Sequence, residues 1–91
     1  MAIRTHVIYR GRVQGVGFRA TAHHIAADLD VSGFVRNLRD GSVELEAQGP
    51  PDQIQRLLDS IATHFGSNIR DVSTQTRDPR TDDQPGFRIT H

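Results

Sequence analysis

The 91-residue chain has no cysteine and no lysine. Without cysteine it cannot form a disulfide, and it has neither a thiol nucleophile nor a thiolate metal site. All eleven basic residues are therefore arginine, which we interpret as a compositional bias. They balance eleven acidic residues, so the formal net charge is zero. This balance gives no reason to expect a nucleic acid or an acidic membrane surface as a partner.

A long apolar run is also absent from the N-terminal segment, residues 1–6, which contains Arg4. A signal peptide or a membrane span would need roughly 7 to 20 consecutive apolar residues there. We therefore predict a cytoplasmic protein with no membrane partner. The length fits one domain, residues 1–91, whose small core is shared between helices and a sheet. The small size and the balanced charge predict a monomer.

Glycine is frequent in one loop, residues 11–19, which read GRVQGVGFR. Gly15 and Gly17 can adopt positive φ values, which lets successive backbone N–H groups point toward one ligand. The helix that follows favours negative charge at its N-terminus. Arg19 adds a planar guanidinium that can bind two phosphate oxygens. The loop therefore predicts a site for a phosphate-sized anion, although a glycine-rich connection can also be a simple turn.

Hydrophobic periodicity predicts five strands and two helices. The predicted elements are, in order, a strand near residues 5–10, a helix over about 19–30, strands over 32–38 and 42–48, a helix over about 52–65, a strand over 69–77 and a short strand over 87–89. This order, β-α-β-β-α-β plus a terminal strand, predicts an α+β fold of the ferredoxin-like, split βαβ type. Both helices should pack on one face of a mostly antiparallel sheet. Asp40-Gly41 predicts a two-residue hairpin, and the polar strand over 69–77 is a candidate sheet edge.

The predicted topology brings Asn37 toward the glycine loop. The first two strands should run parallel on either side of the third, so their C-terminal ends meet at one edge of the sheet. The amide of Asn37 should then be within reach of a bound phosphate, although asparagine is also common before a turn. Glu44 and Glu46 alternate outward on the third strand. Because nothing else in the sequence converges on them, we expect a solvated face and not an acid/base pair.

Several segments closely resemble the signatures of the acylphosphatase family. They are residues 11–19 (GRVQGVGFR), 33–37 (GFVRN), 40–44 (DGSVE) and 87–89 (FRI). The resemblance spans nearly the whole chain in the right order. It implies hydrolysis of a carboxyl–phosphate mixed anhydride, an acyl phosphate, to a carboxylate and inorganic phosphate. It implies no metal and no cofactor, a small-molecule acyl phosphate as substrate, and inorganic phosphate or sulfate as a ligand.

The resemblance also implies roles for individual residues. Arg19 would bind the phosphate and Asn37 would orient the attacking water. The anion would lie in a backbone cradle formed by Gln14, Gly15, Val16, Gly17, Phe18 and Arg19. Phe34 and His91 depart from the residue types usual at their positions. We expect these two departures to affect fine substrate preference and not the chemistry.

Elementary chemistry agrees with this assignment. The leaving carboxylate has a conjugate acid with a pKa of about 4, so it needs no general acid. The transition state mainly requires stabilised phosphoryl oxygens and an aligned water. We expect the proton of the water to go to the phosphate of the substrate, since no side-chain base is apparent. The physiological substrate stays open among glycolytic acyl phosphates, carbamoyl phosphate and acyl-enzyme phosphates.

Other interpretations fit less well. Residues 15–20 match the dinucleotide pattern G-x-G-x-x-G/A, but the second strand turns straight into a hairpin and the chain is too short for a doubly wound sheet. A binding module on the same fold is the main alternative. RNA recognition would need stacking aromatics where the third strand is acidic, whereas a regulatory domain would bind an effector without releasing phosphate. The chain could also be one domain of a larger carbamoyl-transfer protein, although its start at Met1 favours a stand-alone protein.

Overall fold

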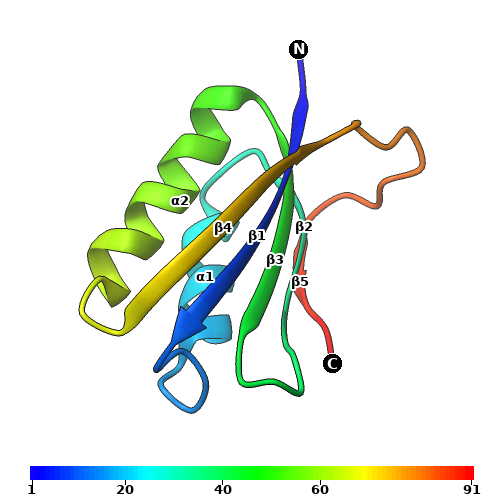
Figure 1. Ribbon diagram of the computed structural model, residues 1–91. Helices are drawn as coiled ribbons and strands as arrows, with labels where there is room; N and C mark the ends of the chain where they lie inside the picture. Colours follow the sequence, from blue (N-terminus) through cyan, green and yellow to red (C-terminus); the bar gives the residue numbers. More distant parts are fainter.

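The computed structural model describes residues 1–91 as a sheet of five strands with two helices packed on one face (Figure 1). The elements are β1 (Ile3–Gly11), α1 (Phe18–Ala27), β2 (Ser32–Asn37), β3 (Val43–Gly49), α2 (Pro51–Phe65), β4 (Ile69–Arg77) and β5 (Phe87–Ile89). This order confirms the predicted α+β, ferredoxin-like arrangement. Neither helix is long and apolar enough to cross a membrane.

The strand order explains which loops lie together. The sheet runs β4-β1-β3-β2-β5, and β1 and β2 each pair antiparallel with β3. β1 and β2 therefore point the same way, and β5 adds a parallel pair beside β2. The loop after β1 and the turn after β2 emerge at the same end of the sheet, in the lower part of Figure 1. β4 is an edge strand, as its polar sequence predicts.

The core lies between the helices and the sheet. Val7, Val35 and Leu45 from three neighbouring strands are at most 1% exposed, and so are Ala22 of α1 and Leu57 of α2. Burying one such leucine or valine contributes about 1.5 to 3 kcal/mol to folding. The helical spacing of apolar residues therefore orients both helices, and it sets the N-terminus of α1 at the end of the sheet where β1 and β2 end.

The connection between β2 and β3 is longer than the predicted two-residue hairpin. The ladder ends at the pair Asn37 and Val43, which leaves residues 38–42 in the turn. Asp40 Oδ1 accepts hydrogen bonds from Ser42 N at 3.0 Å and from the Ser42 hydroxyl at 2.5 Å. Such local side-chain bonds compete with the strand ladder and favour the longer turn. The turn thereby gains the carbonyl groups of Leu38 and Ser42 at the end of the sheet.

The face of the sheet away from the helices is not the solvated face that we expected. Glu46 is 6% exposed and lies 2.5 Å from Arg4 Nε and 3.2 Å from Arg77 Nη1. Arg4 Nη1 also lies 3.3 Å from Asp83 Oδ1. The expectation that nothing converges on Glu44 and Glu46 is therefore wrong. The strand register places Arg4 and His6 of β1 beside Glu46 and Glu44 of β3, and Asp83 of the segment before β5 contacts Arg4.

Glu44 makes stability depend on pH. It accepts hydrogen bonds from His6 Nε2 at 2.7 Å and Arg36 Nε at 2.5 Å. Burial alone would raise the pKa of Glu44, but these two bonds outweigh burial and lower the pKa below its usual 4.5. A carboxyl group with a lowered folded-state pKa stabilises the protein above its unfolded pKa, and this contribution is lost as the pH falls through the folded-state value.

We expect Glu44→Gln to lower the free energy of unfolding by about 1 kcal/mol at neutral pH. The difference from the parent protein should close as the pH falls from 4.5 through the lowered folded-state pKa of Glu44, because the parent carboxylate then becomes protonated. Urea unfolding of both proteins at several pH values measures this. A difference that stays constant down to about pH 3 would contradict the assigned role of Glu44.

Candidate functional site

The glycine loop between β1 and α1 is anchored in the core at both ends. Val13 and Phe18 are at most 2% exposed, and the Phe18 ring stacks on Phe65 with a centroid distance of 4.6 Å. Between these anchors Gly15 and Gly17 are exposed. A short backbone segment is thus presented to solvent from a rigid base.

The conformation of this segment explains its glycines. Gly15 has φ 76° and Gly17 has φ 79°, and a Cβ at either position would meet nothing within 4 Å. Glycine is therefore required by the positive φ and not by crowding. The first helical bond runs from Thr21 N to Gly17 O at 3.0 Å, and no N–H from Gly15 to Ala20 donates to a backbone carbonyl. Free N–H groups at a helix N-terminus form an anion site.

The side chain of Gln14 ties this loop to the turn after β2. Its Nε2 donates to Leu38 O at 2.7 Å and to Ser42 O at 2.9 Å. From the sequence, Gln14 was expected to contribute only its backbone to the site. No local sequence pattern predicts this contact, because its acceptors are the backbone carbonyl groups of the longer turn.

Arg19 and Asn37 lie in one pocket of about 480 Å³. Asn37 ends β2 two positions after the buried Val35, so its side chain is on the helix side of the sheet. The predicted proximity of Asn37 to the glycine loop is therefore confirmed. The pocket is lined by Val13, Gly15, Gly17, Phe18, Arg19, Ala20, Asn37, Ile89 and His91.

Two of the predicted cradle residues do not line this pocket. Gln14 turns toward the β2–β3 turn, and the Val16 side chain is 36% exposed. Two pocket residues, Ile89 and His91, come from the C-terminal segment and were not predicted as site residues. His91 Nδ1 lies 3.4 Å from Arg19 Nη1, so this residue is in contact with the predicted phosphate-binding group.

The pocket is electropositive. Arg19 forms no ion pair with a carboxylate, and no acidic side chain lines the pocket. Nearby Tyr9 is buried, and burial raises the pKa of its phenol above the ordinary value, so Tyr9 is not a base at neutral pH. No group of three or more His, Cys, Asp or Glu side chains is arranged to hold a metal ion. The charge and the free N–H groups together suit a small anion.

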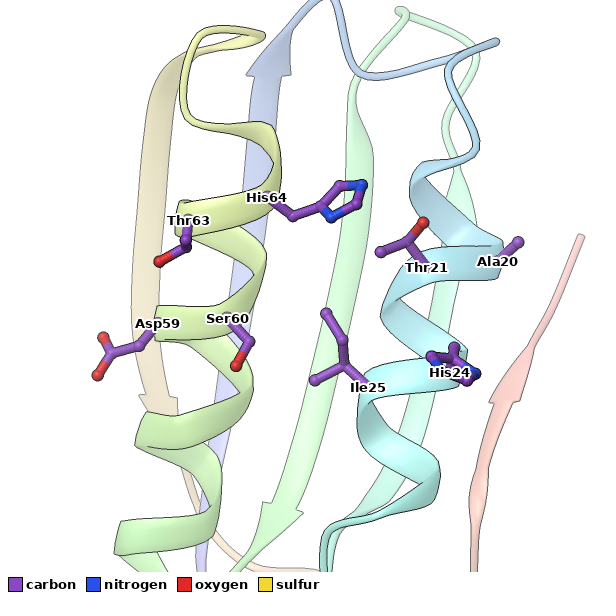
Figure 2. A pocket seen from close by; sticks show the side chains of 8 residues that line it. All are labelled: Ala20, Thr21, His24, Ile25, Asp59, Ser60, Thr63 and His64. Carbon is purple, nitrogen blue, oxygen red and sulfur yellow. The ribbon is translucent and has the colours of Figure 1, made fainter.

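A larger hollow of about 640 Å³ lies between α1 and α2 (Figure 2). Figure 2 shows His64 turned toward α1, whereas Asp59 points away on the other side of α2. The polar groups therefore do not converge on one point. This hollow offers space without a chemical centre, so we assign the site to the smaller pocket.

The assembled loop, pocket and closing strand match a known family. A family model described as acylphosphatase matches residues 5–89. The chain belongs to the acylphosphatase family. An acylphosphatase of Geobacillus thermodenitrificans is 43% identical over 89 residues, which cover 97% of this chain and 94% of the relative.

Solved acylphosphatase structures share the fold. The enzyme from Bacillus subtilis superimposes with a TM-score of 0.87 at 31% identity, over the full length of both chains. The acylphosphatase from Coxiella burnetii gives a TM-score of 0.80 at 30% identity, over 98% of this chain and 93% of that one. Membership of the acylphosphatase family confirms that the chain is an enzyme and that its reaction is the hydrolysis of acyl phosphates.

Proposed function

We propose that the pocket holding Arg19 and Asn37 is the active site, and that it hydrolyses acyl phosphates without a metal ion. Arg19 and the free N–H groups of the glycine loop bind the phosphoryl oxygens. Asn37 holds the attacking water. The observation that carries this proposal is the meeting of a guanidinium without a carboxylate partner, a positive-φ glycine loop and an amide side chain in one pocket.

The reaction needs little from the protein beyond position and charge. The water oxygen attacks phosphorus, and the phosphorus–oxygen bond to the acyl group breaks with its electron pair staying on the carboxylate. Because that carboxylate is a stable leaving group, no general acid is required. The loop and Arg19 stabilise the negative charge on the phosphoryl oxygens in a geometry that is set before substrate binds.

The proton of the water passes to a phosphoryl oxygen of the substrate. No acidic side chain lines the pocket, and the Nδ1 atom of His91 is in contact with Arg19 Nη1. The substrate is a small-molecule acyl phosphate, whose acyl group lies against the apolar wall provided by Ile89 and Ala20. The cytoplasmic location and the monomeric state remain predictions from composition.

A substrate pair tests this function. In buffer containing a metal chelator, we expect the protein to hydrolyse benzoyl phosphate at least on the order of a hundredfold faster than phenyl phosphate, because only the first has a carboxylate leaving group. Release of inorganic phosphate measures both rates. Equal cleavage of the two compounds, or a rate that requires an added metal ion, would contradict the proposal.

A further inference from the structure

His91 reaches the pocket from the segment after β5 and touches Arg19. We propose that the protonated form of His91 is a second cationic contact for the bound phosphoryl group, so that the site binds doubly charged anions more tightly as the pH falls. This inference rests on the proposed function, because it takes Arg19 as the group that holds the phosphate.

The contact depends on the charge of the ring. Arginine N–H groups only donate, so the 3.4 Å contact between Arg19 Nη1 and His91 Nδ1 requires Nδ1 to accept, and His91 must then be neutral. A protonated ring carries N–H on both nitrogens and cannot accept that bond. The contact is exposed to solvent. With an anion on Arg19, the protonated ring donates toward the anion instead.

The distances indicate that the attraction between protonated His91 and the bound anion is larger than the contribution of the contact between neutral His91 and Arg19. A phosphate oxygen bound to Arg19 Nη1 lies about 2.9 Å from it. Since His91 Nδ1 is 3.4 Å from the same atom, the oxygen and the ring nitrogen are at most about 6 Å apart. One added positive charge at that distance from a dianion tightens binding about fivefold in a water-like, salt-screened setting. The long, exposed contact of neutral His91 with Arg19 contributes less to binding.

Arg19 and His91 are the two titratable side chains that line the pocket. On α1, His23 lies one turn beyond Arg19 and His24 lines the hollow between the helices, and neither lines this pocket. β2 presents the neutral Asn37. Arg88 of β5 stays positively charged at any pH of interest. Histidine is the side chain whose charge ordinarily changes between about pH 5 and 8.

Sulfate is the probe of choice because it keeps its double charge across this range. By calorimetric titration, we expect the parent protein to bind sulfate about fivefold more tightly at about pH 5.5 than at about pH 8. His91→Gln should bind with one affinity at both pH values. His91→Lys should bind at about pH 8 as tightly as the parent protein does at about pH 5.5. His23→Ala is the matched control and should keep the parental pH dependence.

The outcomes separate this inference from the proposed function. If His91→Gln keeps the pH dependence, or if sulfate binding by the parent protein weakens at acidic pH, the role of His91 is overturned while the phosphate site stands. If Arg19→Ala binds sulfate as tightly as the parent protein, the phosphate site itself is overturned. Loss of the pH dependence in His91→Gln, together with tight sulfate binding at about pH 8 in His91→Lys, supports a charge on residue 91 and excludes a merely structural role.

Discussion

Arg19→Ala is expected to weaken competitive inhibition by phosphate at least on the order of thirtyfold and to lower kcat/KM for an acyl phosphate by about two to three orders of magnitude. A thirtyfold loss of affinity corresponds to about 2 kcal/mol. Arg19 has no carboxylate partner, so its guanidinium is available to bind two phosphoryl oxygens at the same time. Steady-state kinetics with phosphate as inhibitor measures both quantities.

Two further variants make this test specific. Arg19→Lys keeps the positive charge but loses the planar guanidinium that can bind two oxygens. Its kcat/KM and phosphate affinity should therefore lie between those of the parent protein and those of Arg19→Ala. Arg12→Ala removes an exposed arginine of the same loop that lines a different hollow, beside Asn68 and Arg70, and should leave the kinetics unchanged. Normal hydrolysis of an acyl phosphate by Arg19→Ala would end the assignment of the site.

Asn37→Ala is expected to lower kcat about a hundredfold while changing inhibition by phosphate by no more than about threefold. The reason is that an aligned water matters in the transition state, whereas phosphate binding depends on Arg19 and the loop. The backbone of Asn37 pairs with Val43 and is unaffected by loss of the side chain, so the end of β2 should remain formed. Circular dichroism and urea unfolding check that the variant is folded.

A comparison with Asn37→Asp sharpens this test. The aspartate has the same shape, but its negative charge should repel the phosphoryl group, so both kcat and phosphate binding should fall. If Asn37→Ala loses kcat and phosphate affinity equally, Asn37 belongs to the phosphate-binding set and does not position the water. The difference between the two variants therefore separates water positioning from anion binding.

Most of the fold could be predicted from local patterns. The helical spacing of Ile54, Leu57, Ile61 and Phe65 predicts a helix with one buried face, and these residues are buried along α2. The polar edge strand was predicted with the bounds Ile69–Arg77 that it has. Local patterns succeed here because the periodicity of a strand or helix directly reflects which side chains it buries.

Other features depended on contacts between distant residues. Glu46 alternates with apolar residues as an exposed strand residue would, yet Arg4 and Arg77 approach it from strands far away in the sequence. Gln14 has a visible role only once the turn after β2 offers its carbonyl groups. Spacing along one segment carries no information about the charge that a neighbouring strand brings.

The amino-acid sequence alone determined the element order, the glycine loop at a helix N-terminus, the place of Arg19 in the first turn of that helix and the place of Asn37 at the end of a strand. These follow from short-range sterics and periodicity, which act within a few residues. Only the tertiary structure decided that His91 contacts Arg19 and that the Gln14 side chain donates to the turn after β2. It also decided that charged groups are buried on the face of the sheet away from the helices. Those contacts join residues between 24 and 72 positions apart or depend on strand register, and they exist only when the whole sheet is assembled.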